Sequence, residues 1–155
     1  MEIERKFLIS SLPEGISECR CARIEQGYLD FGDEDEPERR IRKLTEGDKT
    51  LYFYTEKGKG DLCREEEEYE IPEYSYENLK ELVISSILEK TRYYLSVGGF
   101  TAEIDVYGGS LEGLKVAEVE FSSLEEAEGF TPPEFFGEEI TYDKKYRNKN
   151  LARKQ

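Results

Sequence analysis

The sequence predicts an α+β protein that is mainly β: a closed eight-stranded antiparallel β-barrel with helices packed outside it. Three observations support this fold class: eight tracts rich in Tyr, Val, Ile and Phe, short turn-like connections between most of them, and charged residues repeated at every second position. The 155 residues fit a single domain, 1–155, which is long enough to bury a core without disulfides. The predicted strands span residues 2–9, 20–31, 38–45, 49–57, 62–71, 88–97, 100–107 and 115–122.

Turn and capping residues separate these tracts. Gly98-Gly99 suits a two-residue hairpin that needs positive φ angles, so we expect neighbouring strands to pair antiparallel. Three helices are also expected. Ser75 can cap one whose apolar residues Leu79, Leu82, Val83 and Ile87 share a face, Ser123 and Glu126 have capping-box spacing, and Asp143 can cap one from Lys144 to Ala152.

Composition excludes several classes of function. The chain has 22 basic and 36 acidic residues, a net charge of −14, which argues against nonspecific binding to nucleic acid or to an anionic membrane surface. It contains no His, which excludes a His general base, a Ser-His-Asp triad and a His-ligated zinc site. The three cysteines make no CxxC pair, and neither a secretory signal nor a membrane-spanning run is present. We therefore expect a cytoplasmic protein that binds any metal through oxygen.

Like charges recur at alternate positions of the predicted strands. Residues two apart in a strand point to the same face, so each such pair lies side by side. A charged face is ordinarily the solvated face of a half-buried strand. Here, however, most strands carry either acids or bases, with apolar residues between them, in these sets: Glu2, Glu4 and Lys6; Arg40 and Arg42; Glu66 and Glu68; Lys90 and Arg92; Glu103 and Asp105; Glu118 and Glu120.

A barrel with its charged face inward would gather these groups around one lumen. Like charges at close quarters are costly unless counter-charges enter. Divalent metal ions and phosphates supply both signs, because carboxylates bind Mg²⁺, Mn²⁺ or Ca²⁺ while Arg and Lys bind phosphate oxygens. The pattern therefore predicts a polyphosphate site.

The acidic run from Glu65 to Glu68 leaves its register open, since a slip of one residue exchanges the inward pair. We choose Glu66 and Glu68 as the inward pair. This choice assigns Arg64, Tyr69 and Ile71 to the other face.

The sequence resembles the CYTH domain, the family of triphosphate tunnel metalloenzymes, most closely its small bacterial inorganic tripolyphosphatases. The opening ExExK pattern begins a series of motifs that follow the family's order over nearly the whole chain. They are Glu2-Ile3-Glu4-Arg5-Lys6, Gln26-Gly27-Tyr28-Leu29, Arg40-Ile41-Arg42, Lys57-Gly58, Glu66 to Glu70, Glu89-Lys90-Thr91-Arg92, Glu103-Ile104-Asp105, Ala117-Glu118-Val119-Glu120, Phe136-Gly137-Glu138-Glu139 and Tyr146-Arg147-Asn148-Lys149.

The resemblance implies roles for individual residues. Tyr28 would accept a proton beside Lys90, although a strand tyrosine more often packs, and a phenol is a poor base unless cations lower its pKa. The last helix would close one tunnel end or, alternatively, lie on the surface. Phosphates would be bound by Lys6, Arg40, Arg42, Lys57, Lys90 and Arg92, and Mg²⁺ or Mn²⁺ by Glu2, Glu4, Glu118 and Glu120, with Glu66, Glu68 and Asp105 nearby.

The expected function is metal-dependent hydrolysis of inorganic tripolyphosphate to pyrophosphate and phosphate. The alternatives are a thiamine triphosphatase or nucleoside triphosphatase, a class IV adenylate cyclase, or a non-catalytic polyphosphate-binding module. The N-terminal His-Phe of class IV cyclases is missing here. The expected partner is a small triphosphate, with no nucleic acid or membrane, and the expected state is a monomer or homodimer.

Overall fold

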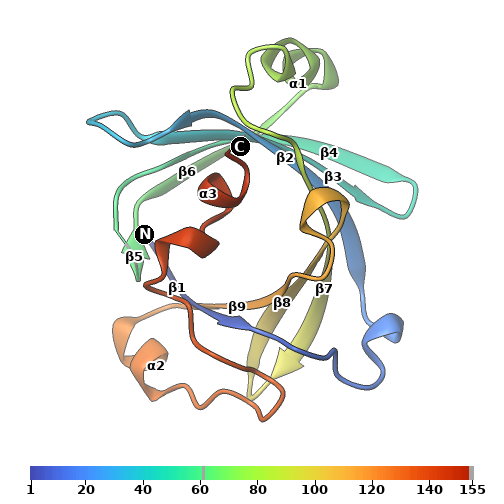
Figure 1. The fold of residues 1–155 in the computed structure, drawn as a ribbon, viewed down its shortest axis with the longest axis vertical. Coiled ribbons are helices and arrows are strands. Elements are labelled where there is room, and N and C mark those ends of the chain that lie inside the picture. The colour runs from blue at the N-terminus through green and yellow to red at the C-terminus, as the bar shows by residue number, and fades with distance from the viewer. Residues whose placement is uncertain (61, 154–155) are drawn as a thin grey trace.

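The computed structural model describes residues 1–60 and 62–153 (Figure 1). Within them, nine strands form one antiparallel sheet in the order β5-β1-β9-β8-β7-β2-β3-β4-β6. The two edge strands, β5 and β6, are joined in the chain by a single residue. The sheet must therefore curl until its edges lie close together, and it nearly closes into a barrel. The strands are β1 (Glu2–Leu8), β2 (Cys21–Phe31), β3 (Glu38–Glu46), β4 (Lys49–Lys57), β5 (Cys63–Arg64), β6 (Glu66–Ile71), β7 (Leu88–Val97), β8 (Phe100–Tyr107) and β9 (Lys115–Phe121).

The tract predicted as one strand at 62–71 forms two strands, which corrects the predicted count of eight. β5 pairs with β1, placing Arg64 opposite Glu2, whereas β6 pairs with β4, placing Glu66 opposite Lys57. The chain changes partner because this segment bridges the gap between β1 and β4. The predicted antiparallel barrel is confirmed in this nearly closed form.

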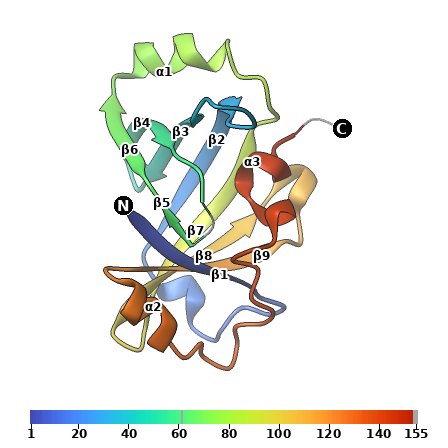
Figure 2. The same ribbon diagram turned by 90° about the vertical axis from the view of Figure 1, so that its left-hand side faces the viewer.

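The apolar face of the strands points away from the centre of the barrel. Ile3 and Phe7 of β1 are buried with Ala117 and Val119 of β9 in a cluster that also contains Phe130. Helix α2 (Leu124–Gly129) packs on β1 and β9 over this cluster (Figure 2). This cluster lies between the barrel wall and its outer cover, as the alternation of apolar and charged residues predicts. A second buried cluster, which includes the tunnel-lining Tyr28 and Ile140, packs against the C-terminal segment.

The predicted helix capped by Ser75 has different bounds. Helix α1 spans Glu73–Lys80 and directly follows Pro72, so Ser75 lies inside the helix and its amide donates to the Pro72 carbonyl. Leu82 and Val83 come after the helix ends, and the Leu82 side chain is exposed. Pro72 occupies the N-cap position in an extended conformation, so the helix begins three residues earlier than a cap at Ser75 would place it.

Two other local signals form as predicted. The Ser123 hydroxyl caps α2 by accepting from the Glu126 amide at 3.1 Å, while the Glu126 carboxylate accepts from the Ser122 amide at 2.9 Å. Gly98 and Gly99 join β7 to β8 with φ angles of 54° and 85°. The helix cap and the hairpin turn are thus both determined by short-range sequence.

The segment after Asp143 is divided into two short elements. The Asp143 carboxylate accepts from the Lys145 amide, and a 3-10 turn η3 (Lys144–Tyr146) precedes helix α3 (Asn148–Leu151). Unlike α1 and α2, this segment lines the interior cavity, which favours closure of a tunnel end over a surface position (Figures 1 and 2). No helix in the described ranges is long and apolar enough to cross a membrane.

Candidate functional site in the barrel tunnel

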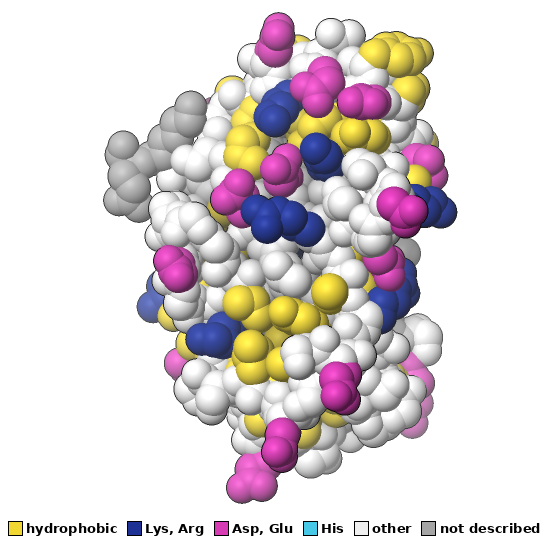
Figure 3. All heavy atoms as spheres, turned by 90° about the vertical axis from the view of Figure 1, so that its right-hand side faces the viewer, with side chains coloured by type: hydrophobic (Ala, Val, Ile, Leu, Met, Phe, Trp, Pro, Cys, Tyr) yellow, Lys and Arg dark blue, Asp and Glu magenta, His cyan; other side chains and the backbone are white. Residues whose placement is uncertain are grey.

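A cavity of about 270 Å³, here called the tunnel, lies inside the barrel. Its described lining contains acidic and basic side chains in equal numbers, so the net charge of −14 resides outside it. On the face drawn in Figure 3, acidic side chains lie scattered among basic and apolar ones. Every predicted site residue except Asp105 lines the tunnel: Glu2, Glu4, Lys6, Tyr28, Arg40, Arg42, Lys57, Glu66, Glu68, Lys90, Arg92, Glu118 and Glu120.

Several lining residues were not among the predicted site residues. Arg64, assigned above to the outer face, lines the tunnel, so that assignment is wrong. Alternation itself places residue 64 on the face of residues 66 and 68, and the change of partner does not alter this. The others come from the start of β3, from β8 and from the C-terminal segment: Glu38, Glu103, Ile140, Thr141, Asp143, Tyr146, Arg147, Asn148 and Lys149.

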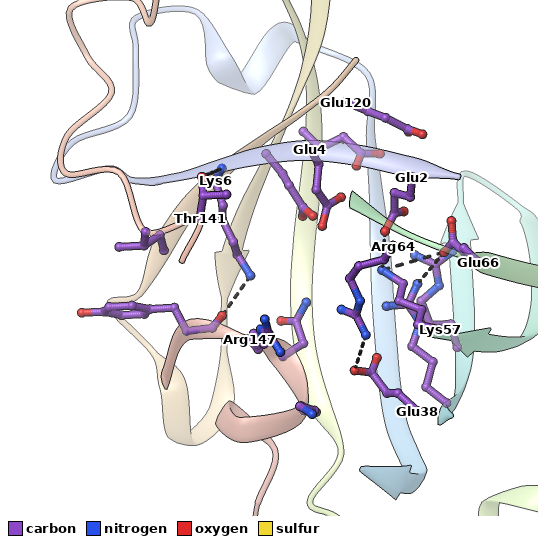
Figure 4. A pocket seen from close by; sticks show the side chains of 18 of the residues that line it. Glu2, Glu4, Lys6, Glu38, Lys57, Arg64, Glu66, Glu120, Thr141 and Arg147 are labelled. Atoms are coloured by element: carbon purple, nitrogen blue, oxygen red, sulfur yellow. Dashed lines mark hydrogen bonds and ion pairs between the residues drawn. The ribbon is translucent and has the colours of Figure 1, made fainter. Parts of the chain in front are cut away.

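Five buried basic residues on β3, β4 and β7 form what we call the cationic wall: Arg40, Arg42, Lys57, Lys90 and Arg92. Each has a carboxylate partner. Arg42 lies 3.1 Å from Glu68, Arg40 lies 3.6 Å from Glu66, and Lys57 donates to Glu2 at 2.9 Å (Figure 4). Burial, with the charges of Arg40 and Arg92, nevertheless lowers the pKa of Arg42 to about 10. The cations are crowded enough that a bound anion would relieve them.

Asp105 lies behind the cationic wall, and both of its carboxylate oxygens are engaged. Arg92 donates to them at 2.8 and 3.0 Å, and Lys90 Nζ lies 2.9 Å away. Burial alone would raise the pKa of Asp105, but Arg92 and Lys90 lower it to about 2. Burial lowers the pKa of Lys90 to about 8 despite this partner. Asp105 therefore holds two tunnel cations in place.

Four glutamates on β1 and β9 form what we call the acidic wall: Glu2, Glu4, Glu118 and Glu120. Glu4 and Glu120 are opposite each other in the β1–β9 register, and Glu2, Glu4 and Glu120 are drawn in Figure 4. Burial and the neighbouring Glu118 raise the pKa of Glu4 well above its usual range. Burial opposes ionisation of Glu118, but its hydrogen bond with Glu4 and the charges of Lys6 and Arg92 lower its pKa. The two carboxyls are therefore coupled, and the charge of Glu118 disfavours ionisation of Glu4.

The acidic wall suits a hard divalent cation by the chemistry of its donors. Its side chains supply carboxylate oxygens, which Mg²⁺ and Mn²⁺ prefer, and a cation beside Glu4 and Glu118 would offset the repulsion that raises the pKa of Glu4. Within residues 1–60 and 62–153, no three Asp, Glu or Cys side chains are already gathered as a ligand set. The donors fit a metal, and rotation of the side chains is needed to assemble its ligand set.

Tyr28 lines the tunnel from β2 and is almost fully buried. Gln26 Nε2 donates to its hydroxyl oxygen at 2.7 Å. Burial raises the pKa of Tyr28 far above its ordinary value, and Arg40 offsets this only in part. The phenol therefore remains protonated at neutral pH, which favours a hydrogen-bond donor over the predicted proton acceptor.

Comparison with known proteins gives a consistent family. An inorganic triphosphatase of Nitrosomonas europaea is 42% identical over 152 residues, which cover 97% of this chain and 96% of that protein. The chain belongs to the inorganic triphosphatase family. A second inorganic triphosphatase, from Acetivibrio thermocellus, is 36% identical over 98% of this chain and 93% of its own length. No family model matched the sequence.

A solved inorganic triphosphatase structure has the same fold as this member of the family. It aligns with a TM-score of 0.71 and 38% identity, covering all of this chain and 96% of the other. The resemblance to the CYTH domain is thereby confirmed. The barrel fold of this chain is thus also the fold of a solved inorganic triphosphatase.

Proposed function

We propose that this protein hydrolyses inorganic tripolyphosphate to pyrophosphate and phosphate with the aid of Mg²⁺ or Mn²⁺. The observation that carries the proposal is the cationic wall facing the acidic wall across one enclosed tunnel. A linear triphosphate needs fixed positive charges for its oxygens, and a divalent cation needs carboxylates. Two relatives named inorganic triphosphatase, matched over nearly their full length, support the choice of substrate.

The cationic wall and Lys6 would bind the phosphates. Arg40, Arg42 and Arg92 can each donate two parallel hydrogen bonds to one phosphoryl group, whereas Lys6 and Lys57 act as point charges. Lys6 is fixed for this role by its 2.9 Å hydrogen bond to the Tyr146 carbonyl. Substrate held in this way needs little covalent assistance from the protein, because phosphoryl transfer depends mainly on positioning and on charge neutralisation.

The acidic wall would hold the metal, with Glu66 and Glu68 nearby. A bound divalent cation supplies charge neutralisation at phosphate oxygens and lowers the pKa of water. We assign Asp105 a positioning role instead, because Lys90 and Arg92 occupy both its oxygens.

Lys90 and Tyr28 would serve proton transfer and hydrogen bonding. Lys90, with its pKa lowered to about 8, can hold or release a proton near neutral pH. Tyr28 would donate its hydroxyl hydrogen to a phosphate oxygen while Gln26 donates to the phenol oxygen.

Phosphate release from tripolyphosphate, with Mg²⁺ or Mn²⁺ and without metal, tests the proposal. Turnover is expected only with metal, and Glu4→Gln and Lys90→Ala should each lose most of it. If neither metal supports turnover, or both variants remain fully active, the proposal fails. Tight binding with metal and no hydrolysis over hours would instead indicate a binding module.

A substrate panel tests the choice of triphosphate. Rates measured side by side on tripolyphosphate, thiamine triphosphate and ATP should favour tripolyphosphate, because the tunnel walls are lined mainly by charged side chains. Cyclic AMP as the main product from ATP would contradict the assignment.

A further inference from the structure

A second cavity of about 340 Å³ adjoins the tunnel beside the C-terminal segment. Within the described residues its lining contains two carboxylates, Asp33 and Glu38, against a larger number of cations. The basic residues that line it are Lys57, Lys59, Arg64, Lys144, Arg147 and Lys149. The second cavity is therefore strongly positive in a chain that is acidic as a whole.

Most of these cations are fixed by neutral groups. Four of them donate to main-chain carbonyl oxygens: Lys59 to Gly32 at 3.1 Å, Arg64 to Gly58 at 3.0 Å, Arg147 to Gly60 at 3.0 Å and Lys149 to Phe31 at 2.9 Å. A carbonyl oxygen holds a cation in position without cancelling its charge. Such an arrangement is preorganised for an anion.

The two carboxylates compensate this charge only in part. Glu38 accepts from Arg64 at 2.9 Å. Asp33 accepts from Arg153 at 2.7 Å, and Arg153 does not line the second cavity. The distance between Asp33 and Lys149 is 4.0 Å. Burial lowers the pKa of Lys149; the charges of Glu38 and Asp33 oppose this shift, and those of Arg147 and Arg64 add to it. Among the described residues, Lys57, Arg64 and Lys149 therefore have carboxylate partners, whereas Lys59 and Lys144 form no ion pair.

The second cavity adjoins the tunnel and shares lining residues with it. Glu38, Lys57, Arg64, Arg147 and Lys149 line both spaces. Figure 4 shows Arg64 reaching toward Glu38, and this ion pair lies on the boundary between the two. An anion leaving the tunnel on this side would pass these shared cations and then meet Lys59 and Lys144, which line the second cavity but not the tunnel.

We propose that the second cavity binds a small phosphate anion and receives the orthophosphate released by hydrolysis. The anion would lie among Lys59, Lys144 and Lys149. The release step rests on the proposed function, whereas the binding site rests on the cavity alone. Lys59 and Lys144 line the second cavity but not the tunnel, so they allow the two sites to be tested separately.

Calorimetric titration of orthophosphate into the metal-free protein tests the binding site. The double variant Lys59→Ala with Lys144→Ala should weaken orthophosphate binding about tenfold, the effect of losing hydrogen bonds from charged donors. Its affinity for tripolyphosphate should stay unchanged. The matched control, Lys49→Ala with Lys80→Ala, removes the same charge from exposed positions elsewhere and should bind orthophosphate like the wild type.

Competition and product inhibition complete the test. Orthophosphate should still bind when excess tripolyphosphate with EDTA fills the tunnel, and the double variant should show weaker inhibition by orthophosphate during turnover. Unchanged orthophosphate affinity in the double variant, equal loss in the control, or full displacement by tripolyphosphate would overturn the second site. Absence of any tripolyphosphate hydrolysis by the wild type would overturn the release step and the proposed function together, while the binding result would stand.

Discussion

The cationic wall and the acidic wall face each other in one tunnel but are stabilised differently. On the cationic wall, Arg42 is paired with Glu68, and Lys90 and Arg92 share Asp105. On the acidic wall, Glu4 lies against Glu118, and burial with the charge of Glu118 raises the pKa of Glu4 although Lys57 acts in the opposite direction. The protein supplies counter-charges for its cations, whereas its acids lack a complete set.

The cationic wall and the acidic wall therefore have different roles in binding. Cations held by internal partners are oriented before substrate arrives, so little conformational entropy is lost on binding. Crowded carboxylates raise the free energy of the metal-free tunnel, and a divalent cation would lower it. Variants on each wall can break or sharpen this comparison, and the effects are expected to decrease in the order below.

Substitution in the acidic wall should have the largest effect on activity. Glu4→Gln should reduce tripolyphosphate hydrolysis about 100- to 1,000-fold, a range typical for loss of one preorganised charge-stabilising group. Because the pKa of Glu4 is raised, a neutral amide should also raise the Tm of the metal-free protein. Phosphate release and thermal unfolding measure the two effects, with the exposed Glu67→Gln as control. Full activity with unchanged Tm would show that the walls do not differ as described.

Loss of the internal counter-charge of the cationic wall should mainly affect stability. Asp105→Asn should lower the free energy of unfolding by about 3 kcal/mol, because it leaves Lys90 and Arg92 buried without their shared carboxylate. Urea denaturation measures the loss. Glu103→Gln, which removes the partly exposed partner of Arg92, is the matched control and should cost less than about 1 kcal/mol. Equal effects of the two variants would contradict the positioning role of Asp105.

The pH dependence of binding should report on Lys90. Its pKa is lowered to about 8, so it is charged below that pH and becomes neutral above it. Tripolyphosphate affinity of metal-free wild type should therefore fall about tenfold relative to Lys90→Arg between pH 7 and pH 9. Calorimetry at both pH values measures the two affinities. The ratio of wild-type affinity to Lys90→Arg affinity is independent of substrate ionisation, because both proteins bind the same substrate. A constant ratio would remove Lys90 from the titrating groups that bind phosphate.

Removal of the Glu68 carboxylate, the partly exposed partner of Arg42, should have the smallest effect. Glu68 is partly exposed and pairs with Arg42, so Glu68→Gln should change the KM for tripolyphosphate by less than about fivefold. The Mn²⁺ concentration needed for half-maximal activity should stay constant if Glu68 serves the cationic wall. A large increase in that concentration would instead place Glu68 among the metal ligands.

Strand alternation explains why so much of the tunnel could be predicted. A period of two relates sequence directly to face, so the spacing of Arg40 and Arg42, or of Glu118 and Glu120, is enough to place each pair on one side of its strand. Arg64 follows the same rule and was assigned incorrectly. The start of α1 was missed for another reason, because Pro72 occupies the N-cap position and the serine signal lies three residues later.

The sequence by itself determined most of the strands, the inward charged face and the resemblance to the family, because these depend on local periodicity and on motif order. It did not reveal that 62–71 divides into β5 and β6. Only the tertiary structure decided how the charges are combined. Asp105 could not be recognised as the shared partner of two cations, since its neighbour Arg92 lies across a strand pair and not beside it in sequence. The second cavity likewise depends on Lys59 and Lys149, which are far apart along the chain and brought together by folding. Two side chains pair when folding brings them close together. A sequence pattern predicts such a pair only where the register of neighbouring strands is regular.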